Sequence, residues 1–251
     1  MNEEAGVASA SEATVKESKV VVRRTVPKWE SDALDRVKGT LKKSQKALSD
    51  LVQRDVNEAD TRLFVTDILC DALGYDKYTE LSTEYRVKTE FADYGLRLDG
   101  DLVAFLEVKR VNTKLGTKHL RQVQSYAVNE GIEWLILTNG SQWQVYHLSG
   151  GLPIITDLAI EIDLLGDSSP LQKASALFYL TKESFKKGKI SELWQAKRAT
   201  SPKSLTKVLL SDNVVAAVKK ELKKTTGYIL ASDEIMRLVR DTCLKMDCME
   251  K

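Results

Sequence analysis

An acidic and a basic side chain alternate in one apolar stretch near the middle of the chain. Glu107 and Lys109 are two residues apart, so in a β-strand both would point to the same face of the sheet. Burying a carboxylate and an ammonium is costly unless they are paired with each other or bind a metal. The rest of residues 102–108 is apolar on both faces, which favours a central strand over a solvated edge strand. The pair therefore indicates a candidate catalytic site.

A second acidic residue, Asp93, precedes a turn signal. Asp99 and Gly100 form a dipeptide that is typical of a tight turn between two strands. With a two-residue loop, Asp93 would face Leu106 and lie on the other side of the sheet from Glu107. With a three-residue or five-residue loop centred on Gly100, Asp93 would lie directly opposite Glu107, with Cβ atoms about 5 Å apart.

Two carboxylates at this separation would need a partner. They repel each other unless a divalent cation lies between them or one of them is protonated. Carboxylate and carbonyl oxygens suit Mg²⁺ or Mn²⁺, and Lys109 would lie beside such an ion. A metal site therefore favours the loop centred on Gly100. The spacing alone leaves a second interpretation open, in which Glu107 and Lys109 form an ordinary exposed pair at a strand edge.

The elements that must position these residues follow from apolar periodicity. Helical spacing predicts one helix from residue 31 to about residue 51, and a second from the N-cap residue Asn57 to Gly74. A third helix is expected over about residues 117–130. Alternating and fully apolar runs predict strands. These are expected near residues 80–88, 93–98, 102–109, 133–138, 142–148 and 154–163.

The last third of the chain has a different character. After about Pro170, apolar residues recur at helical spacing and no strand is expected. We therefore predict a flexible N-terminal tail (1–30), an α/β domain (31–165) and a basic helical region (166–251). Residues 181–226 contain twelve Lys or Arg and four Asp or Glu, a local net charge of +8. Such a surface could hold a phosphate backbone, although lysines on solvated helix faces are common. The candidate nucleic-acid ligands are Lys186, Lys187, Lys189, Lys219, Lys220, Lys223 and Lys224.

Composition limits the class of protein. The net charge is only +2, so the whole chain gives no strong nucleic-acid signal. The three cysteines lack metal-ligand spacing, and two histidines are too few for a zinc cluster. No apolar run is long enough to span a membrane, and the first residues do not resemble a signal peptide. The sequence also lacks a Gly-rich phosphate loop for ATP. We expect a soluble, cytoplasmic protein that does not bind membranes and has no ATP-driven motor.

Six short motifs occur in an order that characterises one protein family. They are EADTR (58–62), ILCDALGY (68–75), ADYGL (92–96), LEVK (106–109), QVQSY (122–126) and LTNG (137–140). Together they resemble the N-terminal nuclease domain of the type I restriction enzyme R subunit, a member of the PD-(D/E)XK nuclease superfamily. The resemblance covers roughly residues 50–165. It implies a restriction-endonuclease-like α/β core, in which a mixed central sheet is flanked by helices.

The resemblance also implies metal ligands and a catalytic lysine. Asp93 and Glu107 would be the metal-binding carboxylates, and the Val108 carbonyl would be a further ligand. Lys109 would position or deprotonate the attacking water and stabilise charge on the phosphate. The residue before the key aspartate is Ala92, where many members of the superfamily have proline.

Three further residues match family positions around this centre. Gln122 and Tyr126 correspond to a Gln-x-x-x-Tyr motif, and on a helix their four-residue spacing places them on one face. There they would brace the metal site or contact the DNA backbone. Glu58 corresponds to a glutamate of the first helix that points into the site in some relatives.

We therefore expect a nuclease that depends on Mg²⁺ or Mn²⁺ and hydrolyses phosphodiester bonds, with DNA as the expected substrate. Expected partners are DNA and other subunits of a restriction system, and a homodimer is plausible because many nucleases of this fold pair two sites. The alternative is a non-catalytic module of a restriction or defence complex, which would bind nucleic acid or serve as an adaptor. The sequence does not decide which base sequence is cut, whether the substrate is DNA or RNA, or whether it is single-stranded or double-stranded.

Overall fold

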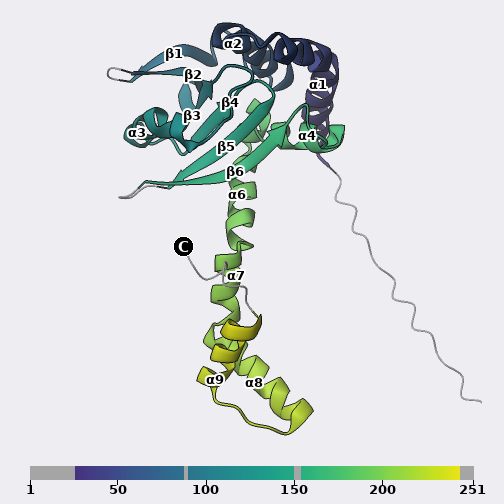
Figure 1. Cartoon of the computed structure of the whole chain (residues 1–251), viewed down its shortest axis with the longest axis vertical. Helices are drawn as coiled ribbons and strands as arrows, with labels where there is room; N and C mark the ends of the chain where they lie inside the picture. The colour runs from purple at the N-terminus through teal and green to yellow at the C-terminus, as the bar shows by residue number, and fades with distance from the viewer. Residues whose placement is uncertain (1–25, 88–89, 150–153, 244–251) are drawn as a thin grey trace, which may run out of the picture.

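The computed structural model describes residues 26–87, 90–149 and 154–243. An α/β body contains the sheet and the N-terminal helices, and a chain of helices extends from it (Figure 1). Most of the expected tail, residues 1–30, lies outside the described residues. The predicted mixed sheet with flanking helices and the predicted helical C-terminal region are both confirmed.

Two helices precede the sheet. Helix α1 (Lys28–Arg54) is followed by α2 (Glu58–Asp67), which continues as a π-helical turn, η1 (Ile68–Ala72). The N-cap residue predicted for α2 is confirmed, because the Asn57 side chain accepts a hydrogen bond from the Asp60 N–H. Gly74 ends this segment with a φ of 81°, a conformation that favours glycine.

The sheet has six strands in the order of the sequence. Its members are β1 (Leu81–Val87), β2 (Glu90–Leu98), β3 (Asp101–Val108), β4 (Trp134–Thr138), β5 (Gln142–Ser149) and β6 (Ile155–Asp163). All neighbours pair antiparallel except β3 and β4, which are parallel. The crossover between these two contains a 3-10 turn, η2 (Thr117–Leu120), and helix α3 (Arg121–Asn129). Strand β3 is therefore central, as its apolar sequence predicts.

The β2–β3 hairpin combines a two-residue turn with a bulge. Leu98 pairs with Asp101 across the turn, where Asp99 and Gly100 have φ values of 53° and 93°. The register then shifts by one residue, so that Tyr94 pairs with Leu106. The expected loop centred on Gly100 is therefore wrong, because a β-bulge supplies the offset that we assigned to the loop.

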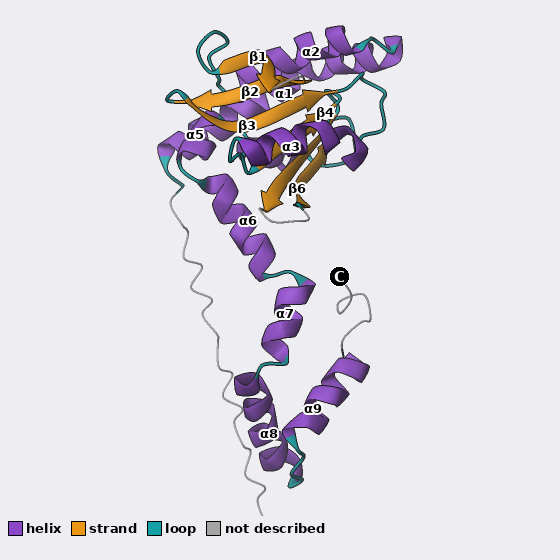
Figure 2. Ribbon diagram, turned by 90° about the vertical axis from the view of Figure 1, so that its left-hand side faces the viewer, coloured by secondary structure: helices purple, strands orange, loops and turns teal. Residues whose placement is uncertain are grey.

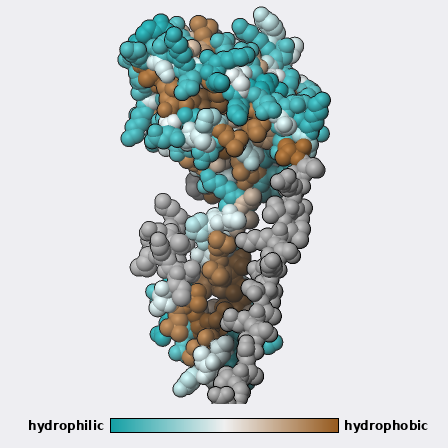
Figure 3. All heavy atoms as spheres, turned by 90° about the vertical axis from the view of Figure 1, so that its right-hand side faces the viewer, coloured by the Kyte–Doolittle hydropathy of each residue, from teal (hydrophilic) through white to brown (hydrophobic). Residues whose placement is uncertain are grey.

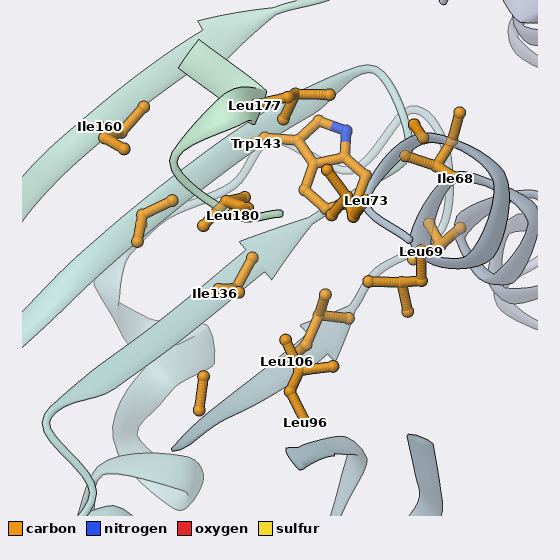
Figure 4. Close-up of a cluster of buried hydrophobic side chains, with 14 of the residues drawn as sticks. Ile68, Leu69, Leu73, Leu96, Leu106, Ile136, Trp143, Ile160, Leu177 and Leu180 are labelled. Atoms are coloured by element: carbon orange, nitrogen blue, oxygen red, sulfur yellow. The ribbon is translucent and has the colours of Figure 1, made fainter. Parts of the chain in front are cut away.

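Helices cover both faces of the sheet. The larger core lies between one face and α1, α2, η1 and the helices that follow β6. Figure 4 shows its centre, where Leu69 and Leu73 face Leu106 and Trp143. On the opposite face, α3 packs over a smaller core that includes Phe105. Figure 2 shows α3 in front of the sheet and α1 behind it.

Helices continue to the end of the described chain. They are α4 (Pro170–Phe178), α5 (Lys182–Lys186), α6 (Lys189–Ala199), α7 (Pro202–Leu209), α8 (Asp212–Thr226), α9 (Ser232–Leu238) and the π-helical turn η3 (Val239–Cys243). Helix α6 begins the extension and remains attached to the sheet. The Trp194 ring stacks on His147 of β5 at a centroid distance of 4.9 Å, and the Lys197 ammonium donates to the Leu158 and Ala159 carbonyls.

Candidate active site

The bulged hairpin sets the positions of the two candidate metal ligands. Because Tyr94 pairs with Leu106, the next position in the same register brings Asp93 opposite Glu107. Asp93 also contacts the backbone beside Glu107, since the Val108 N–H donates to Asp93 Oδ2 at 2.7 Å. The bulge is thus the local feature that lets a two-residue turn place both acids at one end of β3.

Glu107 and Lys109 form a close ion pair at the end of β3. The Lys109 ammonium donates to Glu107 Oε1 at 2.6 Å, and Glu107 is only 8% exposed. Glu58 from the first turn of α2 is the second carboxylate near the ammonium, with 3.8 Å between Lys109 Nζ and Glu58 Oε1. The exposed-pair interpretation is therefore wrong for Glu107, and three of the predicted residues meet at one point.

Arg62 is a component of this site that the sequence analysis did not assign. Its guanidinium forms an ion pair with Asp93, with 3.1 Å between Arg62 Nη2 and Asp93 Oδ1. A signal for it was present in the sequence, because Arg62 follows Glu58 by four residues and therefore shares its helix face. One face of α2 thus delivers a carboxylate to Lys109 and a guanidinium to Asp93.

The burial of the site changes the protonation equilibria of the Glu107–Lys109 pair. Burial raises the pKa of Glu107 above its ordinary value, and the Lys109 hydrogen bond only partly opposes this effect. Burial alone would lower the pKa of Lys109. The hydrogen bond to Glu107 and the charges of Glu107, Glu58 and Asp93 outweigh it, so the pKa of Lys109 is raised. This environment favours the ammonium form of Lys109 and disfavours the ionised form of Glu107.

The available donors suit a hard divalent cation. Within the described parts of the chain, no group of three or more His, Cys, Asp or Glu side chains is arranged to hold a metal ion. The set predicted from the sequence is Asp93, Glu107 and the Val108 carbonyl, all oxygen donors of the kind that Mg²⁺ and Mn²⁺ prefer. Glu107 Oε2 is buried and has no hydrogen-bond partner among the described residues. An unpartnered buried carboxylate oxygen fits a cation ligand.

Two predicted residues have described backbones but no described side chains. Gln122 and Tyr126 lie one helical turn apart in α3, which contacts β3 and covers the sheet face that carries Phe105. Their side chains lie outside the described residues, so their assigned roles stay predictions.

The predicted nucleic-acid lysines fall into two groups that lie far apart. Those near the body are partly engaged, since Lys186 pairs with Asp99 at 2.7 Å and Lys189 with Glu192 at 2.7 Å. Lys187 is exposed beside them. The others lie on α8, at the end of the helical extension distant from β3 (Figure 1). Their members are Lys219, Lys220, Lys223 and Lys224. The structure brings neither group to the candidate site, because Asp99, the partner of Lys186, lies at the opposite end of β3 from Glu107.

Comparison with known proteins finds a similarity over part of the chain. The family model for the type I restriction enzyme R protein N terminus (HSDR_N) matches residues 57–157. The matched segment runs from the N-cap residue of α2 into β6, so it contains Glu58, Arg62, Asp93, Glu107 and Lys109. The resemblance seen in the motifs is confirmed over this segment. No curated protein and no solved structure gives a significant match to the chain.

A search of the described helices finds none with the length and apolarity to cross a membrane.

Proposed function

We propose that the chain is a divalent-metal-dependent endonuclease of the PD-(D/E)XK type that hydrolyses phosphodiester bonds in DNA. One observation carries this proposal. A buried glutamate with an unpartnered oxygen, an aspartate and a lysine meet at the end of a central strand. They do so inside the segment that matches type I restriction R proteins.

Asp93, Glu107 and the Val108 carbonyl are the residues that would hold the metal. When bound, Mg²⁺ or Mn²⁺ would supply Lewis-acid stabilisation of the negative charge on the scissile phosphate. The chain prepares these ligands. The Arg62 guanidinium and the Val108 N–H fix the two Asp93 oxygens, so the carboxylate needs little reorganisation.

Lys109 contributes a positive charge rather than a base in this proposal. Its raised pKa keeps the ammonium protonated, and Glu58 and Glu107 hold it at the end of β3. An ammonium in this position orients the attacking water and neutralises charge that develops on the phosphoryl oxygens. Glu58 is a positioning residue, because it acts through Lys109.

The proposal also assigns partners. DNA would be the substrate, and the lysines that follow the sheet, Lys186, Lys187 and Lys189, would hold the phosphate backbone through counterion release. Other subunits of a restriction system are proposed as partners because the matched family consists of restriction subunits. A homodimer would pair two sites for cutting both strands.

Cleavage of supercoiled plasmid and linear single-stranded DNA in Mg²⁺, Mn²⁺ or EDTA tests the proposal. We expect cutting that requires the metal and is lost in Asp93→Ala and in Lys109→Ala. A matched control is Lys173→Ala, whose ammonium donates to the Gly166 carbonyl away from the site and should not affect the rate. If the folded wild-type protein cuts no DNA in either Mg²⁺ or Mn²⁺, the proposed nuclease activity is refuted. Salt-sensitive DNA binding without cutting would instead support the non-catalytic binding module.

A further inference from the structure

The chain that follows β3 carries basic side chains and no acidic ones. Residues 109–129 contain five Lys or Arg, and the first Asp or Glu after Glu107 is Glu130. We call residues 110–121 the crossover segment, because they lead from the end of β3 into α3. Its basic side chains are Arg110, Lys114, Lys118 and Arg121. This stretch of positive charge therefore begins next to Lys109 of the candidate site.

The sheet places the crossover segment at the same end of β3 as the site. Strands β3 and β4 are parallel, and the Lys109 N–H donates to the Thr138 carbonyl at 2.8 Å, where both strands end. Asn139, the next residue after β4, donates from Nδ2 to the Thr113 carbonyl at 3.0 Å. The segment is thus attached to the carboxyl ends of the two central strands, beside Glu107 and Lys109.

Further contacts fix the backbone of the segment. Asn112 Nδ2 donates to Asp55 Oδ1 at 2.9 Å, and Arg110 pairs with the same carboxylate. All large apolar side chains of the segment are buried; they are Val111, Leu115 and Leu120. A ligand of the exposed side chains would therefore not have to order this backbone, which removes one cost of binding.

Three cations of the segment face solvent without a counterion. Lys114, Lys118 and Arg121 are exposed and form no ion pair with a described residue. The carboxylates at this end of the sheet have other partners: Asp55 pairs with Arg110, Glu58 and Glu107 with Lys109, and Asp93 with Arg62. The three cations are therefore available to an anionic ligand.

His119, within the segment, indicates that this positive charge is continuous with that of the site. Burial lowers the pKa of His119, and the charges of Lys118 and Lys109 lower it further. The Gly116 carbonyl and Glu58 oppose this effect only in part. One ring therefore lies close enough to be influenced both by a cation of the segment and by the lysine of the site.

The absence of exposed apolar anchors from the segment decides which anion fits. Protein interfaces have an apolar core, and an acidic protein would find only charges here, because Val111, Leu115 and Leu120 are buried. A phosphate backbone needs only the charges. The helical extension differs, since Figure 3 shows apolar side chains gathered along it, which phosphates would leave in water.

We propose that Lys114, Lys118 and Arg121 bind the DNA phosphates that flank the scissile bond. The identity of the substrate rests on the proposed function. These contacts would hold the backbone at the end of β3, which neither lysine group predicted from the sequence reaches. They would set the position of the DNA without reading its bases.

The salt dependence of DNA binding tests this inference with the full-length protein. A short labelled DNA duplex is titrated in EDTA at several KCl concentrations, and binding is followed by fluorescence anisotropy. Each phosphate contact adds about 0.9 to the slope of log affinity against log salt, so the triple variant Lys114→Ala, Lys118→Ala, Arg121→Ala should reduce that slope by about 2.7. Its affinity at low salt should fall by about tenfold or more.

A matched variant separates local contacts from net charge. Lys220→Ala, Lys223→Ala, Lys224→Ala removes the same charge from α8 and should leave the slope unchanged. An unchanged slope in the first triple variant, with circular dichroism like that of the wild type, would overturn the inference. Equal reductions in both variants, or displacement of the duplex by polyglutamate as effectively as by unlabelled DNA, would overturn it too.

The test is independent of cutting, because EDTA removes the metal. A wild type that binds DNA through the segment but cuts none in Mg²⁺ or Mn²⁺ would refute the proposed function and support this inference. A wild type that cuts DNA, with a first triple variant that binds DNA as the wild type does, would refute this inference alone.

Discussion

Replacement of Glu107 by glutamine removes a buried charge and keeps the shape of the side chain. Burial raises the pKa of Glu107 in the folded protein. The stability that is linked to such a carboxyl is present below its unfolded pKa, about 4.3, and is lost as the pH rises through the folded pKa. At neutral pH the ionised carboxylate therefore costs free energy of folding, and Glu107→Gln removes that cost.

The size of the effect follows from the contacts of the two carboxylate oxygens. Oε1 accepts from Lys109 at 2.6 Å, and the glutamine carbonyl oxygen can keep this bond. Oε2 is buried without a partner, and an unsatisfied buried polar group costs about 1–3 kcal/mol, more when it is charged. The glutamine amide recovers part of this. We expect Glu107→Gln to be about 1 kcal/mol more stable than wild type in EDTA.

Divalent metal should reverse the order of stability. A ligand at about 100 times its Kd stabilises the folded state by about 2.7 kcal/mol, and the variant lacks one metal carboxylate. In saturating Mg²⁺ the wild type should therefore exceed Glu107→Gln by about 2 kcal/mol. The reversal separates a metal ligand from a structural ion-pair residue.

Urea unfolding followed by circular dichroism measures both conditions at neutral pH. Glu192→Gln is the matched control, because Glu192 is an exposed carboxylate paired with Lys189 and its loss changes the net charge equally. The reasoning is refuted if Glu107→Gln is less stable than wild type in EDTA. It is also refuted if Mg²⁺ stabilises wild type and variant by the same amount.

Three other results are expected. Burial alone would raise the pKa of Glu183, but two hydrogen bonds from Arg36 lower it. The stability that this ion pair contributes is therefore present above the unfolded pKa and is lost as the pH falls through the folded pKa. Glu183→Gln should reduce the loss of stability at acid pH in a plot of urea midpoint against pH, and an unchanged acid limb would contradict this. Leu106→Ala, at a fully buried position of β3, should lower the free energy of unfolding by about 2–5 kcal/mol in urea titrations, and a loss well below this range would argue against the central strand. Arg62→Ala should weaken Mn²⁺ binding measured by calorimetry by about tenfold, because Asp93 loses its orienting partner; unchanged affinity would remove Arg62 from the site.

The order and type of the elements were predictable because their patterns are local. The largely apolar β3 and the apolar face of α1 have unambiguous patterns, and Asn57 and Gly74 mark helix ends by their own chemistry. The β2–β3 loop was not predictable from the same signals. The Asp99-Gly100 dipeptide favoured a two-residue turn, whereas the candidate site required Asp93 to lie opposite Glu107. A β-bulge satisfies both requirements, but sequence patterns do not report it.

The site shows the same division between local and tertiary information. Glu107 and Lys109 could be paired from spacing within one strand, and Asp93 from the hairpin. The contact of Arg62 with Asp93 depends on how α2 packs against the end of β3, which no local pattern encodes. Long-range packing also decides how far the α8 lysines lie from the site.

Calorimetric titration of Mn²⁺ into the wild type, Asp93→Asn and Glu107→Gln tests the central claim, that these carboxylates form a metal centre. We predict saturable binding by the wild type and loss of that site in both variants, with folding verified by circular dichroism. Binding of equal affinity and stoichiometry in all three proteins would contradict the account.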